Sequence, residues 1–457
     1  MSDTSPAKRP NLLFIFADQM RSQAMGCSGN EQMVTPHLDR LASEGIRLTN
    51  AISTYPICCP ARAMMLTGKF PLSNGVMTNG PALPDTEITI GEILKAEGYQ
   101  TAYIGKWHLH GHGSIKGESY GSPQFVPPGP ARHGFDYWAA ANIVHDYYNS
   151  FYFTDSPDRI HIEGWEPDFQ TDLAINYMEE HAGDSDPFCL FLSWGPPHFP
   201  YEAPEEYRKL YDPDKLQLRE NVFVSEREKI ANYYAAITSL DVNIGRLMAS
   251  LDQLGITDDT IVVFTSDHGD QLFSLYLIHK QWPYEETISV PFLIRYPRKL
   301  QLGLINDVLM GTPDILPTLL DLMDVEIPDH VEGRSLASFL MGQPDGEEPD
   351  SLLIEVIAPN GVVMDRCGMR AWRGVRTKRH TFARFRDDDW LLIDNKYDPF
   401  QRRNLIYNPD YRSLRDELND CLESWLEKTN DPFLPPTAYP RTEMVDNQPP
   451  LLSGETD

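Results

Sequence analysis

The 457-residue chain is short of basic residues and has no long apolar run. Its 39 lysines and arginines stand against 67 aspartates and glutamates, a net charge of -28, which argues against nucleic acid or an anionic membrane surface as its main partner. No stretch approaches the roughly 20 apolar residues of a membrane-spanning helix, and the first ten residues lack a signal-peptide core. We therefore expect a cytoplasmic protein, although a secreted chain trimmed of its signal peptide would look the same.

Cysteine is also scarce. The six cysteines show neither the pattern of a disulfide framework nor the Cys-x-x-Cys pair typical of zinc sites, so reduced thiols are expected. Hydrophobic residues make up 41% of the chain, enough for a large α/β domain and a smaller one beside it.

One cysteine lies in an unusual segment. Residues 56–68 read Pro-Ile-Cys-Cys-Pro-Ala-Arg-Ala-Met-Met-Leu-Thr-Gly. Because proline favours the first turn of a helix, we expect a helix to begin at Pro60 and Cys58 to lie just before its N-terminus. Unpaired N–H groups and the positive end of the dipole favour a thiolate or an anion there, and Arg62 adds a permanent cation. A buried structural cysteine is the ordinary alternative.

Two predicted strands end in carboxylates. Residues 11–17 and 260–266 are continuous apolar runs typical of buried parallel strands, and they lead directly into Asp18-Gln19 and Asp267-His268. In open α/β sheets ligands bind beyond the carboxyl ends of the strands. Hard carboxylates that converge there suit Ca²⁺ or Mg²⁺. For Asp18 alone, a strand-to-loop cap is an equal alternative.

Basic side chains follow two further predicted strands. Residues 100–104 lead into Lys106, a point charge suited to an anionic oxygen, and His108, which can exchange a proton near neutral pH. Residues 188–194 lead into a Pro-His-Phe-Pro loop that carries His198. Taken alone, each of these side chains would more often be an ordinary surface residue.

Together these segments resemble the signatures of the sulfatase family. Cys-x-Pro-x-Arg followed by a hydrophobic pair and Thr-Gly is similar to the first signature, whose cysteine is oxidised after translation to formylglycine. Residues 98–108 match the second signature, and residues 265–269, Thr-Ser-Asp-His-Gly, resemble the metal segment. A cysteine-dependent phosphatase would need arginine six residues after the cysteine, where Met64 and Met65 stand. The resemblance covers most of residues 10–410.

The resemblance implies hydrolysis of a small-molecule sulfate ester on an alkaline-phosphatase-like fold. A maturase would act transiently on the cysteine; the hydrated aldehyde would attack sulfur, form a covalent sulfo-enzyme and release sulfate by re-forming the aldehyde. One divalent cation would assist, with Ca²⁺ preferred and Mn²⁺ or Mg²⁺ as alternatives. The implied metal ligands are Asp18, Gln19, Asp267, His268 and the oxygen that replaces the thiol of Cys58. The implied catalytic residues are Cys58, Arg62 to hold the diol, His108 to assist its deprotonation, Lys106 and Lys280 to bind sulfate oxygens, and His198 to protonate the leaving alcohol, with Lys280 as a second candidate.

The implied metal ligands depart from the family's usual pattern at two positions. Many relatives have a second Asp where Gln19 stands and Asn where His268 stands, so a carboxylate is exchanged for an imidazole, which leaves room for Mn²⁺. Both substitutions also occur in the related phosphonate monoester hydrolases, which share the formylglycine. Hydrolysis of phosphonate monoesters or phosphodiesters is therefore the alternative function, against which Lys106 and His108 favour a sulfatase.

The sequence is less informative about the substrate alcohol. Leu275-Tyr276 stands where the family usually has a polar residue and glycine, so substrate contacts there are in doubt. A loop rich in Gly, Ser and Pro at residues 111–132 is expected to lie over the site. The oligomeric state, including a homo-oligomer, stays open, as does a binding protein that keeps the fold and never matures Cys58.

We expect three parts in the chain. They are a catalytic α/β domain with a large, mostly parallel sheet flanked by helices (1–345), a C-terminal subdomain with a small antiparallel sheet and a helix (346–430), and a proline-rich tail (431–457). The expected C-terminal elements are short strands at 372–377, 380–385 and 390–393 and a helix at 412–428.

Overall fold

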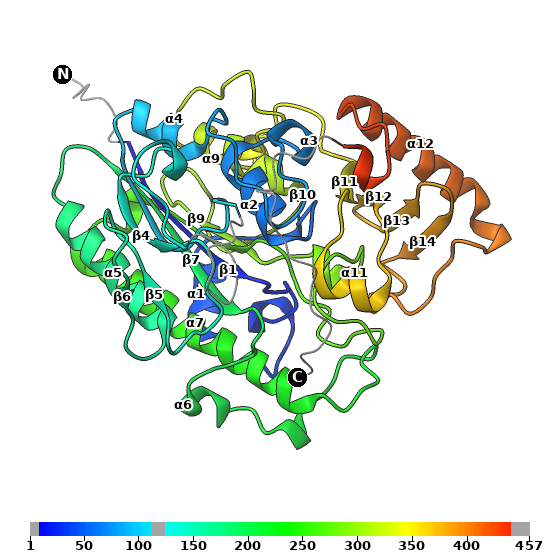
Figure 1. Ribbon diagram of the computed structural model, residues 1–457, viewed down its shortest axis with the longest axis horizontal. Helices are drawn as coiled ribbons and strands as arrows, with labels where there is room; N and C mark the ends of the chain where they lie inside the picture. The colour runs from blue at the N-terminus through cyan, green and yellow to red at the C-terminus, as the bar shows by residue number, and fades with distance from the viewer. Residues whose placement is uncertain (1–8, 112–123, 440–457) are drawn as a thin grey trace.

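The computed structural model describes residues 9–111 and 124–439 (Figure 1). Residues 112–123 of the expected loop over the site, and residues 440–457 of the expected tail, lie outside the described residues. Within the described ranges, no helix is long and apolar enough to cross a membrane.

An eight-stranded sheet forms the centre of the larger part of the molecule. Its strand order is β10-β2-β9-β8-β1-β7-β3-β4, and every pair is parallel except those of β9, which runs antiparallel to β2 and β8. The strands are β1 (Asn11–Asp18), β2 (Ile46–Ile52), β3 (Gln100–Lys106), β4 (Tyr137–Ala141), β7 (Phe188–Pro197), β8 (Thr260–Ser266), β9 (Phe292–Arg295) and β10 (Leu304–Gly311). The central strands β8, β1 and β7 are buried along their whole length, as strands covered on both faces must be.

Helices cover both faces of this sheet (Figure 1). On one face, Leu13 and Ile15 of β1 pack in one apolar cluster with α1 (Pro36–Ser43), α5 (Glu166–His181) and α7 (Arg227–Leu254). On the other face, Phe14 and Phe16 pack with α2 (Cys58–Thr67), α4 (Ile90–Ala96) and α9 (Ile315–Leu322). Shorter elements are α3 (Pro71–Asn74), α6 (Glu205–Arg208), α8 (Glu285–Ile288), α10 (Ala337–Leu340), α11 (Gly361–Cys367), β5 (Phe151–Tyr152) and β6 (Ile160–His161).

A separate four-stranded antiparallel sheet lies toward the C-terminus, in the order β11-β12-β13-β14. Its strands are β11 (Ser351–Val356), β12 (Trp372–Thr377), β13 (His380–Phe385) and β14 (Asp389–Asp394), and helix α12 (Arg412–Lys428) packs on one face. The predicted fold class is confirmed; β11 is the C-terminal strand that was not expected from the sequence.

The other face of the C-terminal sheet packs against the segment around the start of α2. Trp372 and Ile354 belong to the same apolar cluster as Ile57 and Met64. The hydroxyl of Tyr55 accepts hydrogen bonds from the N–H groups of residues 357 and 358, at 2.7 and 3.1 Å. The small sheet therefore supports the helix that carries Cys58.

Candidate active site

Helix α2 begins earlier than the sequence indicated. Cys58 is its first residue and Ile57 its N-cap, so the prediction that Cys58 precedes a helix starting at Pro60 is wrong. The proline is tolerated at the third position because the first N–H groups of a helix have no partner inside it. The free N–H of Cys59 donates instead to Oδ1 of Asn79, at 3.0 Å. Cys58 still lies at the positive end of the helix.

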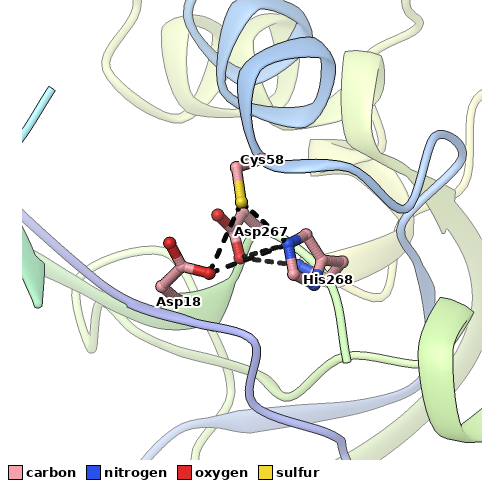
Figure 2. A group of neighbouring side chains, drawn as sticks. All are labelled: Asp18, Cys58, Asp267 and His268. Carbon is pink, nitrogen blue, oxygen red and sulfur yellow. Dashed lines mark hydrogen bonds and ion pairs between the residues drawn. The ribbon is translucent and has the colours of Figure 1, made fainter. Parts of the chain in front are cut away.

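Four potential ligands converge beyond the ends of β1 and β8 (Figure 2). Asp18, Cys58, Asp267 and His268 are all buried, and one ligand atom from each lies within 4.8 Å of the others. The sulfur of Cys58 lies 3.3 Å from Nε2 of His268 and donates to Oδ1 of Asp18 at 3.7 Å. Strands β1 and β8 are adjacent and parallel, with Ala17 opposite Ser266, which is why the two carboxylates meet.

Arg62 holds the two carboxylates in place. Its Nε donates to Asp267 at 3.1 Å and its Nη2 to Asp18 at 3.3 Å, and all three side chains are buried. Its Nη1 donates to the carbonyl of Lys106 and to Oγ of Ser193, at 2.8 and 2.9 Å. With its N–H groups committed to these acceptors, Arg62 fixes the cluster as a rigid frame.

Two lysines place positive charge beside Asp18 and Cys58. Nζ of Lys106 lies 2.5 Å from Oδ2 of Asp18, and Nζ of Lys280 donates to the sulfur of Cys58 at 2.9 Å. Burial raises the pKa of the Cys58 thiol and Asp18 adds to this, but Lys280, Lys106 and His268 outweigh both and lower it below its ordinary value. Although burial opposes it, the charges of Cys58, Asp18 and Asp267 raise the pKa of Lys280, so this ammonium stays protonated.

Gln19 is positioned so that its amide oxygen can serve as a ligand. Its Nε2 donates to Oδ2 of Asp270 at 2.6 Å, and the hydroxyl of Tyr201 donates to the same oxygen at 2.7 Å. Its buried Oε1 has no hydrogen-bond partner among the described residues. Buried polar atoms are rarely left unpaired, so this oxygen fits a cation held with the two carboxylates and the imidazole. The donor set of oxygens and one nitrogen suits a hard or borderline divalent metal.

Two imidazoles stack at the edge of the site. The ring of His145, on the loop after β4, lies parallel to that of His198, with centroids 4.4 Å apart and 14° between the planes. Burial, and after it the charge of Lys106 or Lys280, lowers the pKa of each ring well below 6.5. Both rings are therefore neutral at pH 7 in the ligand-free site.

His108 contacts Cys59 through its backbone carbonyl. The residue is buried, its N–H donates to the carbonyl of Asn142, and its own carbonyl accepts from the thiol of Cys59 at 2.9 Å. Its implied part in deprotonating the diol stays a prediction, as do the implied roles of the other site residues.

Sequence reasoning missed three residues of the site. Asp270 orients Gln19, and its position in Asp-His-Gly-Asp could have suggested it. His145 and Ser193 belong to no motif and reach the site only because β4 and β7 flank β3 in the sheet.

Glu166, near Lys106, is a buried carboxyl whose pKa is raised toward neutral pH. Glu166 accepts a hydrogen bond from Oγ of Ser150 at 2.7 Å, and burial raises its pKa from 4.5 to about 7. Because the folded-state pKa is the higher one, the folded state loses stability relative to the unfolded state as the pH rises from about 4.5 to 7.

In the Glu166→Gln variant this titration is absent. The difference in free energy of unfolding between the variant and wild type should therefore rise by about 3 kcal/mol in favour of the variant across that window. Urea unfolding at pH 5 and 7.5 measures the gain; an equal difference at both pH values would contradict it.

The comparisons with known proteins agree with this geometry. The family described as Sulfatase matches residues 10–325, and the family described as N-sulphoglucosamine sulphohydrolase, C-terminal, matches residues 275–428. An ulvan-active sulfatase of Formosa agariphila is 39% identical over 434 residues, 93% of this chain and 82% of that protein. An N-acetylglucosamine-6-O-sulfatase of Bacteroides thetaiotaomicron is 28% identical over 93% of this chain and 88% of its own length.

Solved structures show the same fold. The crystal structure of the putative sulfatase yidJ from Bacteroides fragilis superposes with a TM-score of 0.84 at 32% identity, over 95% of this chain and 98% of that one. A phosphonate monoester hydrolase of Agrobacterium radiobacter gives a TM-score of 0.76 at 21% identity, over 92% of this chain and 96% of that one, which shows the shared fold alone. On these grounds the chain belongs to the sulfatase family of the alkaline phosphatase superfamily and is a sulfuric ester hydrolase.

Proposed function

We propose that the chain hydrolyses sulfate esters of saccharides, using a formylglycine made from Cys58 and a divalent cation. The observation that carries this proposal is the convergence of Asp18, His268 and Lys280 on the sulfur of Cys58, at 3.7, 3.3 and 2.9 Å. The residue that aligns with the oxidised cysteine of the family is thus the one on which the charged groups converge.

The chain's own residues bind the sulfate and position the reacting atoms. The ammonium group of Lys106 contacts Asp18 and that of Lys280 contacts Cys58, so both are placed to bind sulfate oxygens. Arg62 keeps Asp18 and Asp267 in fixed positions. Nζ of Lys280 lies 2.9 Å from the sulfur of Cys58, which makes Lys280 a candidate beside His198 for the donor to the leaving alcohol.

The absent groups would supply the remaining chemistry. A cation held by Asp18, Asp267, His268 and the amide oxygen of Gln19 would stabilise negative charge on the sulfuryl oxygens. The hydrated formylglycine at position 58 would supply the nucleophilic oxygen. The imidazole and amide in this donor set keep Mn²⁺ beside Ca²⁺ as a candidate metal.

The substrate class rests on the relatives. The two curated relatives described above are named for activity on ulvan and on N-acetylglucosamine 6-O-sulfate. Both align over 93% of this chain, which supports a saccharide as the alcohol here. Phosphonate monoester hydrolysis is the second candidate because Gln19 and His268 match the pattern of those enzymes, and the shared fold is compatible with it.

Two measurements on protein made in a host that contains a maturase test the proposal. Mass spectrometry of the peptide that contains Cys58 should show formylglycine. The kcat/KM for an aryl sulfate should exceed that for a phenyl phosphonate monoester by at least about tenfold. A thiol mass together with no turnover of either ester would contradict enzymatic function, and a large preference for the phosphonate would select the second candidate.

A further inference from the structure

Three large aromatic side chains are exposed beside the segment that follows the metal ligands. Phe199, Phe223 and Tyr276 are 50%, 52% and 69% exposed. The rings of Phe223 and Tyr276 stack, with centroids 5.3 Å apart and 29° between the planes. Phe199 meets His279 edge to face at 6.0 Å. Single exposed apolar residues are common, whereas a contiguous exposed pair such as Phe223 and Tyr276 is a candidate binding surface.

Phe199 and Tyr276 are close in the sequence to residues of the reacting centre. Phe199 follows His198, and His279 precedes Lys280, whose Nζ is 2.9 Å from the sulfur of Cys58. Tyr276 is four residues before Lys280, so their Cα atoms are at most about 14 Å apart. The stacked pair therefore lies within reach of a substrate that extends beyond its sulfated unit.

The backbone under Tyr276 is held in a conformation that suits glycine. Tyr276 has φ 63° and Leu275 has φ 57°, in the left-handed region that bulky residues rarely adopt. The resemblance to the family places glycine at this position. Each such residue costs on the order of 1 kcal/mol or more, and strain of this kind concentrates at ligand-binding segments. A tyrosine at this strained backbone position therefore points to a function for its ring.

The segment is also fixed in place before any ligand binds. The N–H of Leu275 donates to the carbonyl of Asn221 at 2.7 Å, and that of Leu277 donates to Ser274 at 3.0 Å. An isolated bridge joins Val222 to Ser274, which brings the chain beside Phe223 against the chain beside Tyr276. The stacked rings therefore form a preorganised surface, which lowers the entropy cost of binding.

We infer that Phe223 and Tyr276, together with Phe199 beside His279, form a platform for saccharide units beyond the sulfated one. This inference rests on the proposed hydrolysis of saccharide sulfates. Flat rings stack on the C–H faces of sugar rings. Two exposed polar residues, Glu220 and Ser225, flank Phe223 in the sequence, and Glu220 pairs with Arg402 at 3.1 Å. A lipid chain would favour a continuous apolar surface without such charged and polar residues beside it.

Removal of the Tyr276 ring tests the platform. Ulvan oligosaccharides of graded length and 4-nitrophenyl sulfate serve as substrates for the matured protein. In wild type, kcat/KM should rise with oligosaccharide length. In Tyr276→Gly, the ratio of kcat/KM for the long oligosaccharide to that for the aryl sulfate should fall about tenfold, mainly through KM. Glycine relieves the left-handed backbone, so the variant should fold at least as stably as wild type.

Two further variants keep the result interpretable. Phe223→Ala removes the other ring of the pair without changing the backbone of residue 276, and the same fall in the ratio is expected. Tyr407→Gly removes a ring that is 79% exposed on the C-terminal part of the chain, and it should leave the ratio unchanged.

Each other outcome has a definite meaning. Turnover of sulfate esters with no dependence on oligosaccharide length, or an equal ratio in Tyr276→Gly and wild type, overturns the platform and leaves the proposed function intact. A fall confined to long-chain alkyl sulfates would overturn it in favour of a lipid ligand. Loss of all sulfate ester turnover in matured wild type would contradict the proposed function itself.

Discussion

Cys58→Ala is expected to lower kcat/KM for any sulfate ester by at least about 10⁴-fold, because it removes the precursor of the proposed nucleophile. The variant should still fold, since Arg62 holds Asp18 and Asp267 without help from the sulfur. Initial rates with an aryl sulfate, measured beside a thermal melt, separate loss of chemistry from loss of structure.

Cys59→Ala is the matched control. Cys59 has the same side chain one residue later, but burial raises its pKa to about 12 and its thiol donates to the carbonyl of His108. It therefore has no reactive thiolate, and its replacement should lower activity less than about threefold and stability by about 1 kcal/mol. Equal losses in Cys58→Ala and Cys59→Ala would refute the assignment of Cys58 as the precursor.

Arg62→Met should damage both stability and activity. The change removes a buried cation from between two buried carboxylates, Asp18 and Asp267, and leaves their charges with fewer partners. Breaking a buried ion pair from one side costs about 3–5 kcal/mol of unfolding free energy. The carboxylates also lose their fixed positions, so kcat should fall by at least about 10²-fold. Urea unfolding and steady-state kinetics measure the two effects.

Arg40→Ala provides the comparison for charge removal at the surface. Arg40 pairs with Glu44 one turn later on a largely exposed helix face, at 2.6 Å. Exposed pairs of this kind contribute little, so a change within about 0.5 kcal/mol and unaltered kinetics are expected. If Arg62→Met were as mild as Arg40→Ala, the frame attributed to Arg62 would be wrong.

Much of the fold could be predicted because its central strands are long apolar runs bounded by polar residues. Residues 11–17 and 260–266 match β1 and β8 almost to the residue, since strands buried on both faces admit few polar side chains. The start of α2 was missed by two residues because proline is compatible with several positions in the first turn. Strand β11 was missed although a turn signal, Pro-Asp-Gly followed by a second proline within residues 344–349, comes directly before its apolar run.

Some residues of the candidate site could be predicted from the sequence, and others could not. Asp18, Cys58, Asp267 and Lys280 lie in recognisable segments, and the structure brings them together. His145 could not have been found from the sequence, because its approach to His198 depends on which strands are neighbours in the sheet. The pairing of Gln19 with Asp270 likewise depends on a contact across 251 residues of chain.

The deep burial of Cys58 bears on when its proposed maturation could occur relative to folding. The residue is 1% exposed, and its neighbours Ile57 and Met64 pack beneath a C-terminal sheet that is made last. An enzyme that oxidised this thiol would need access to the chain around it, so it would have to act before these layers close. At about 5–20 residues per second, the sheet follows the cysteine segment off the ribosome by about 15–60 s. The proposed maturation would therefore have to precede folding, and a chain that folded first would keep the thiol.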